Sequence, residues 1–377
     1  MTRRIISNLF ILLLFVGNCY AQDKPLIKTF PASAGEILEL RVDPGNIDVK
    51  TWDKNEVKIE VVSKKKYEIE DLVAEKSGSI IKFFLELEDG WKNSVTVNVH
   101  SPSKFNFDLR STGGNISLED KINGSLKANT EGGNVSFQDI VGEVEVNTSG
   151  GNISGENVNG MTSLHTKGGN ISLGNVKGGK ADVNTYGGNI SVGDVDSDLS
   201  AKTHGGNLSI GNVGGNAQVF TYGGHISLDK VSGSAEMETY GGHLSLEGAS
   251  GEVVAKTMGG HISLEDITGS IEASTKGGHV SAELNPNPNT SSSLETTGGH
   301  MDLKIPANAK ATIEVFIEND ELEDEDPKDI LKSDFPAKTF EVDKDAGELK
   351  ATYVLNGGGA EVSMKVLGGK VKIEKWK

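Results

Sequence analysis

The chain has 377 residues, a net charge of −17, 48 glycines and only 6% aromatic residues. This composition suits a thin core crossed by many tight turns, and the length allows one long repeat domain or two ordinary domains. Arginine is almost absent, because only Arg41 and Arg110 lie beyond the extreme N-terminus. An acidic, arginine-poor surface argues against nucleic acid and anionic membranes as partners.

Residues 1–21 have the pattern of a secretory signal, with two arginines at the start, an apolar run at 9–16 and a cleavage site predicted after Ala21. We therefore expect export to the periplasm, the outer-membrane surface or the extracellular space. The apolar run is too short for an ordinary transmembrane helix, and no later segment predicts one. Lipid attachment at Cys19 is the alternative. Cys19 is the only cysteine, so the mature chain is expected to have no thiol chemistry.

Residues 22–110 alternate apolar and polar side chains in the manner of β-strands. Strands are expected near residues 37–40, 47–49, 57–61, 80–87 and 95–99. The polar stretch 68–77 is expected to interrupt this rhythm. Residues 44–49 are similar to a degenerate copy of the repeat that follows, which predicts an irregular N-terminal cap of a stacked array.

Residues 111–303 repeat the phrase Thr-x-Gly-Gly-Asn/His-Ile-Ser-Leu at intervals of 18 or 19 residues, with a final interval of 21. The spacing of Ile and Leu places both on one face of a strand, and Gly-Gly marks a corner. Eighteen residues cannot bury their own apolar face, so the coils must stack. The sequence therefore predicts an all-β, single-chain parallel β-solenoid with two strands per coil, right-handed by the general rule for parallel crossovers.

Residues 304–377 lose the repeat and are expected to form a C-terminal β cap that hides the last strand edge. Strands are predicted near 349–355 and 362–366. The acidic segment 318–329 lacks the spaced ligands of a calcium site, so it is expected to be a solvated loop.

One outward column changes chemistry along the array. The residue after Gly-Gly is Asn in the first six copies and His in the last five, namely Asn115, Asn134, Asn152, Asn170, Asn189, Asn207, His225, His243, His261, His279 and His300. A structural ladder of stacked side chains is the first interpretation. The alternatives for the five histidines are shared Zn²⁺ or Cu²⁺ binding and pH sensing, because protonated neighbours repel. The second alternative predicts that acid destabilises residues 220–303 before 111–210.

The position before Gly-Gly carries Tyr186, Tyr222 and Tyr240, with His204 between them. An outward aromatic strip suits stacking against sugars, whereas scattered surface aromatics need no function. A column of threonines also repeats, but it lies in phase with Ala and Val and is therefore expected to point inward. This phase argues against an ice-binding face.

No nucleophile and base stand in an obvious arrangement, and no cofactor is expected. Residues 43–53 (DPGNIDVKTWD), 95–99 (VTVNV) and the Thr-x-Gly-Gly-Asn-Ile-Ser array resemble the bacterial "putative adhesin" family of β-strand-repeat proteins, which is similar to the head domains called GIN. The histidines depart from that pattern. The resemblance implies a secreted or surface-located β-solenoid without a known ligand.

We therefore expect a non-catalytic adhesin-like or structural protein, with cell-surface glycans or envelope proteins as partners. One alternative is a carbohydrate-binding or polysaccharide-cleaving β-helix. The other is a metal- or pH-responsive protein built on the histidine column.

Overall fold

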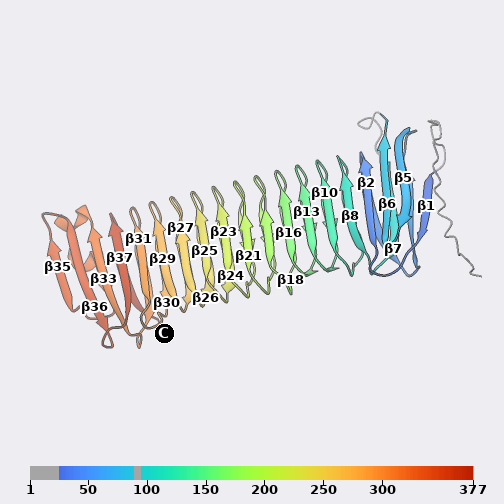
Figure 1. The fold of residues 1–377 in the computed structure, drawn as a ribbon. Helices are drawn as coiled ribbons and strands as arrows, with labels where there is room; N and C mark the ends of the chain where they lie inside the picture. Colours follow the sequence, from blue (N-terminus) through green and yellow to red (C-terminus); the bar gives the residue numbers. More distant parts are fainter. Residues whose placement is uncertain (1–24, 89–94, 377) are drawn as a thin grey trace, which may run out of the picture.

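The computed structural model describes residues 25–88 and 95–376, which form a rod of stacked β-coils (Figure 1). Two long sheets, called sheet A and sheet B, run along the rod, and each regular coil adds one strand to each sheet. The predicted signal at 1–21, including Cys19 and the cleavage site, lies outside the described residues. Within the described part of the chain, no helix has the length and apolarity to cross a bilayer.

Along the rod, the strands of each sheet follow the chain order except at the two ends. Sheet A contains, in spatial order, β1 (Leu26–Pro31), β4 (Glu56–Val62), β7 (Val95–Pro102), β3 (Gly45–Trp52), β9 (Ile116–Leu118), β11 (Val135–Phe137), β14 (Ile153–Gly155), β17 (Ile171–Leu173), β20 (Ile190–Val192), β22 (Leu208–Ile210), β24 (Ile226–Val231), β26 (Leu244–Ala249), β28 (Ile262–Ile267), β30 (Val280–Leu284), β32 (Met301–Pro306), β38 (Val371–Trp376) and β34 (Leu331–Ser333). Sheet B contains, in the same direction, β5 (Ile69–Ser77), β6 (Ile80–Leu87), β2 (Ile37–Asp43), β8 (Asn106–Ser111), β10 (Leu126–Thr130), β13 (Val144–Thr148), β16 (Thr162–Thr166), β19 (Ala181–Asn184), β21 (Leu199–Lys202), β23 (Ala217–Thr221), β25 (Ala235–Thr239), β27 (Glu252–Lys256), β29 (Ser270–Thr275), β31 (Ser291–Thr296), β37 (Ala360–Leu367), β33 (Ala311–Glu318), β36 (Glu348–Leu355) and β35 (Thr339–Asp343).

Equivalent residues of successive coils pair side by side in parallel strands. Ser136, for example, is in register with Ser117 on one side and Ser154 on the other. The Ile and Leu positions flanking the serines are buried between the sheets, as at Ile171 and Leu173. The predicted all-β stack of parallel strands is therefore confirmed, and its core is the set of apolar columns that the alternating pattern indicated.

The coils between residues 122 and 231 also have a third, short wall that the sequence did not predict. It consists of β12 (Ile140–Val141), β15 (Val158–Asn159) and β18 (Val176–Lys177), continued by single bridges through Val195 and Val213. These valines are buried in the core. The prediction of two strands per coil was therefore incomplete, because one or two paired residues are too few to give a strand pattern.

The N-terminal end is closed by antiparallel strands. β4 pairs antiparallel with both β1 and β7, and β5 pairs antiparallel with β6. The expectation that residues 68–77 interrupt the strand rhythm was wrong, since β5 occupies nearly all of that stretch. Pairing with β6 at the sheet edge requires backbone hydrogen bonds more than apolar side chains, so a polar sequence can form this strand.

The C-terminal end is interleaved. β37 and β38, the last two strands of the chain, insert between the coil of β31 and β32 and the coil of β33 and β34. The acidic segment 318–329 is largely exposed, as expected, but it is not only a loop. It contains the 3₁₀-helix η2 (Asp320–Glu323) and the helix α1 (Pro327–Ile330), each with one buried residue, Leu322 and Ile330, that packs into the core.

The Gly-Gly corner brings successive coils together through a buried threonine. Thr148 is 6% exposed, and its hydroxyl donates to the carbonyl oxygen of Gly133 at 2.9 Å while accepting from the amide of Gly151 at 3.2 Å. The same pair of bonds recurs at Thr166, Thr185, Thr203, Thr221, Thr239, Thr257 and Thr275. The inward orientation predicted for this column is confirmed.

The two glycines of each corner differ sharply in the space around them. A Cβ placed on Gly224, the second glycine, would lie 1.9 Å from the carbonyl oxygen of Gly206 in the previous coil. A Cβ on Gly223, the first glycine, would meet no atom closer than 3.9 Å. The second glycine is therefore required for the coils to stack at this corner, whereas the first is not.

We expect Gly224→Ala to destabilise the protein by about 3 kcal/mol, because the new methyl group forces two backbones apart. Gly223→Ala is the matched control and should change the free energy of unfolding by less than about 1 kcal/mol. Urea unfolding of both variants measures the difference. Equal stabilities of the two variants would contradict this account of the corner.

Candidate functional site

The Asn and His side chains that follow Gly-Gly form one continuous row along the rod, called the Asn/His row. Each side chain accepts a hydrogen bond from the backbone amide of the equivalent residue in the next coil. Asn134 Oδ1 accepts from the Asn152 amide at 2.8 Å, and His243 Nδ1 accepts from the His261 amide at 2.8 Å. Oδ1 and Nδ1 are both bonded to Cγ, so histidine can replace asparagine without changing this contact. The interpretation as a structural ladder accounts for the whole row.

The row extends beyond the regular array at both ends. Asn46 Oδ1 accepts from the Asn115 amide at 2.9 Å. The degenerate copy at residues 44–49 therefore makes the same contact as a regular coil. At the other end, His300 Nδ1 accepts from the amide of Lys370 at 3.0 Å. The Asn/His row therefore runs from one cap of the rod to the other.

The five imidazoles stack face to face. The ring centroids of His243 and His261 are 4.8 Å apart with an interplanar angle of 1°, and the other neighbouring pairs are similar. Because Nδ1 accepts a backbone hydrogen bond, the proton of each neutral ring lies on Nε2. Two Zn–N bonds of about 2.1 Å span at most about 4.2 Å, so parallel rings at this spacing do not share one ion.

Within residues 25–88 and 95–376, no group of three His, Cys, Asp or Glu side chains is arranged to hold a metal ion. Protonation is disfavoured at one position of the stack. The pKa of His243 is lowered, first by burial in the stack and then by repulsion from His225 and His261. Protonation of Nδ1 also removes the acceptor for the amide of the next coil.

The tyrosines predicted as ligand-binding residues form a continuous exposed strip with His204. Tyr186 and His204 lie 4.8 Å apart, His204 and Tyr222 5.0 Å, and Tyr222 and Tyr240 5.3 Å, measured between ring centroids. Tyr186, Tyr222 and Tyr240 are 60%, 46% and 44% exposed. The structure brings all three together into what is called the aromatic strip, so they are not scattered surface residues.

A groove of about 580 Å³ lies beside the N-terminal end of the aromatic strip, on the outer face of sheet B. One wall is the corner segment that includes Lys167 and Tyr186. Its floor is a line of side chains at equivalent positions of β2, β8, β10, β13, β16 and β19, called the Arg–Asn row. These are Arg41, Arg110, Asn129, Asn147, His165 and Asn184, each in register with the next.

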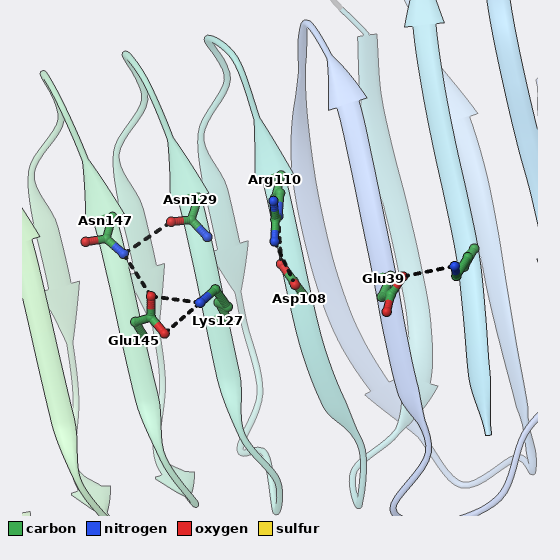
Figure 2. Close-up of polar contacts among 8 residues, drawn as sticks. Glu39, Asp108, Arg110, Lys127, Asn129, Glu145 and Asn147 are labelled. Atoms are coloured by element: carbon green, nitrogen blue, oxygen red, sulfur yellow. Dashed lines mark hydrogen bonds and ion pairs between the residues drawn. The ribbon is translucent and has the colours of Figure 1, made fainter.

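Polar contacts hold the Arg–Asn row in place. Figure 2 shows Arg110, Asn129 and Asn147 at one level on neighbouring strands. Arg110 forms two contacts of 3.1 Å with Asp108, and Asn147 Nδ2 donates to Asn129 Oδ1 at 3.2 Å. The sequence did not predict this groove, and the two isolated arginines were its only signal.

His165 of the Arg–Asn row also contacts a serine. Ser163 Oγ lies 3.0 Å from His165 Nε2, and His165 Nδ1 lies 3.3 Å from the side-chain nitrogen of Asn184, which donates to Asp182 at 2.7 Å. An amide nitrogen facing Nδ1 leaves the imidazole proton on Nε2, directed at Ser163. In this tautomer His165 cannot accept the serine proton, so the contact lacks the geometry of an activated nucleophile.

Comparison with known families supports the resemblance seen in the sequence. Residues 36–210 match the Toastrack DUF4097 family. This match confirms the predicted resemblance for the N-terminal cap and the first half of the array, which include the Arg–Asn row. The match does not include the second half of the array or the C-terminal cap.

Several solved structures are distantly similar. A "putative adhesin" from Bacteroides fragilis NCTC 9343 is 13% identical with a TM-score of 0.35, covering 60% of this chain and 98% of its own. A second from Parabacteroides merdae ATCC 43184 is 12% identical with a TM-score of 0.26, covering 74% and 95%. A "putative lipid binding protein" from Parabacteroides distasonis ATCC 8503 is 14% identical with a TM-score of 0.20, covering 75% and 98%. Similarity at these TM-scores carries no functional argument. No curated protein matches the chain.

We expect acid to loosen the histidine half of the rod first. The folded-state pKa of His243 lies below the unfolded value of about 6.5, so its contribution to stability is complete above that value and is lost as the pH falls through the lowered folded value. Hydrogen exchange at about pH 7 and about pH 5 should show protection lost at residues 220–303 before 111–210.

The matched control replaces all five histidines of the row with asparagine, which keeps the backbone hydrogen bond, as Asn207 does for the His225 amide at 2.8 Å. This variant should lose protection evenly along the rod. Equal losses in both halves of the unmodified protein would contradict the prediction.

Proposed function

We propose that this chain is an exported, non-catalytic, adhesin-like β-solenoid of right-handed winding that binds glycans of the cell surface or envelope through its lateral face. The observation that carries the proposal is the aromatic strip, in which Tyr186, His204, Tyr222 and Tyr240 contact one another while remaining exposed. Export rests on the signal pattern of residues 1–21, and the right-handed winding rests on the general rule for parallel crossovers.

The strip has the properties of a binding surface. Its rings are held on successive coils of a rigid sheet, so little side-chain freedom is lost when a ligand binds. Tyrosine offers an apolar face for the carbon-bound hydrogens of a sugar and a hydroxyl for its polar edge. Met258 continues the same column and is 44% exposed, which extends the apolar surface by one coil. Exposed apolar side chains that adjoin one another in this way support the proposal of an interaction site.

The tautomer of His165 supports a binding role over a polysaccharide-cleaving one. With its proton on Nε2, His165 cannot act as a base toward Ser163. In this proposal residues 22–110 and 304–377 act as caps, and residues 111–303 supply the binding surface.

Glycan-array binding of the purified chain tests this proposal. We expect Tyr222→Ala combined with Tyr240→Ala to weaken binding about tenfold or more, because two stacking rings are removed. Phe340→Ala is the matched control, since Phe340 is 41% exposed but lies in β35, outside the aromatic strip. A chain that binds no glycan, or binding unaffected by the tyrosine changes, would rule the strip out as the glycan site.

A further inference from the structure

We propose that the groove over the Arg–Asn row binds a linear, carboxylate-bearing oligosaccharide lying parallel to the rod axis. This inference rests on the proposed glycan-binding function and assigns a second, chemically distinct subsite next to the aromatic strip. Tyr186 belongs to both, because it ends the strip and lines the groove.

The shape of the groove fits an extended ligand. Its volume of about 580 Å³ is within the range of small-molecule sites. The six side chains of the Arg–Asn row stand on six consecutive strands of sheet B, so they repeat at the strand spacing of about 4.8 Å. A ligand with repeating polar groups can contact several members of the row at once.

The amides of the row offer both donors and acceptors to hydroxyl groups. Asn147 donates one hydrogen bond to Asn129 Oδ1 and another to Glu145 at 3.3 Å. Within the described part of the chain, this leaves the side-chain oxygen of Asn147 and the side-chain nitrogen of Asn129 without a partner. Neighbouring acceptor and donor atoms of this kind match the vicinal hydroxyls of a sugar.

The groove is less acidic than the chain as a whole, although Asp43 and Asp108 pair with its two arginines. The protein carries a net charge of −17, yet the charged groups that line the groove are Arg41, Arg110, Lys167 and a single carboxylate, Glu131. The pairing of β2 with β8 places Arg41 directly beside Arg110. These are the only arginines outside the extreme N-terminus, and both stand in this groove.

The two guanidinium groups remain accessible. Their side chains are 57% and 56% exposed. Arg41 has one long contact of 3.4 Å with Asp43, and the two contacts of Arg110 with Asp108 hold its guanidinium in a fixed orientation. The contacts with Asp108 use the Nε–H and one Nη2–H of Arg110, so the Nη1 hydrogens and the second Nη2 hydrogen remain for a ligand. These donors can form paired hydrogen bonds with a carboxylate, which selects a carboxylated sugar over a neutral one. The groove lacks the large exposed apolar anchors that a protein partner would need, because Tyr186 is the only exposed aromatic that lines it.

Titration of the full mature chain with oligogalacturonate tests the proposal, and the carboxyl-reduced neutral oligosaccharide is the matched ligand. We expect Arg41→Gln combined with Arg110→Gln to weaken oligogalacturonate binding at least about tenfold, because charge-assisted hydrogen bonds are lost. The unmodified protein should bind the neutral oligosaccharide about as weakly as the double variant binds oligogalacturonate. The two arginine substitutions should not weaken binding of the neutral oligosaccharide any further. Binding of the acidic ligand should fall as salt is raised.

Lys177→Gln combined with Lys338→Gln removes the same charge from exposed positions outside the groove and should leave binding unchanged. Arg41→Lys combined with Arg110→Lys keeps the positive charge but removes the paired N–H donors of the guanidinium. This variant should bind oligogalacturonate with intermediate affinity. Thermal unfolding of each variant verifies that the fold is kept.

Equal binding of the acidic and neutral ligands, or unchanged binding by the Arg→Gln variant, would overturn the groove proposal. If Tyr222→Ala with Tyr240→Ala still abolishes glycan binding in that case, the proposed function stands without this subsite. Failure of the unmodified chain to bind any glycan would overturn both.

Discussion

The close approach of successive backbones at the Gly-Gly corner is the constraint on which this rod depends. The second glycine leaves no room for a Cβ, since one on Gly242 would lie 1.8 Å from the Gly224 carbonyl oxygen. The buried threonine hydroxyl then satisfies a carbonyl of the previous coil and an amide of its own corner. An Asn or His side chain satisfies the next amide. These contacts pair the polar groups that a sharp, buried corner would otherwise leave unpaired.

The contacts at this corner explain which positions of the repeat keep the same residue in each coil and which positions vary. Thr bonds to the backbone of two glycines, the second Gly leaves room for the neighbouring backbone, and Asn or His bonds to the next backbone amide. The residue between Thr and Gly-Gly points outward, so it changes along the rod and forms the aromatic strip. The exchange of Asn for His between Asn207 and His225 keeps the backbone contact while adding a titratable group. One row thus combines a single backbone contact with two kinds of side chain, of which only the histidines can titrate near neutral pH.

The Arg–Asn row begins where the regular repeat has not yet started, and the aromatic strip lies at a position of the repeat whose residue varies from coil to coil. The Arg–Asn row begins on β2 and β8, where the N-terminal cap meets the first regular coils, and the aromatic strip begins where the row ends, beside Tyr186. A rigid sheet holds both, and an extended ligand could contact both without any change in the rod.

The sequence by itself determined the parallel stack, the inward threonines, the Gly-Gly corners and the Asn/His row, because a residue repeated at a fixed interval must occupy the same place in every coil. It also located the three tyrosines correctly in one column. Tertiary structure decided the rest. β5 formed from a polar stretch because β6 offered an edge to pair with, and Leu322 and Ile330 turned an acidic segment into a core-covering element. The Arg41–Arg110 pair arose from the long-range pairing of β2 with β8 across the same 69 residues that separate Asn46 from Asn115. Aligning the degenerate copy at residues 44–49 with the first regular coil matches the two arginines, but only the folded stack shows that both side chains line one groove.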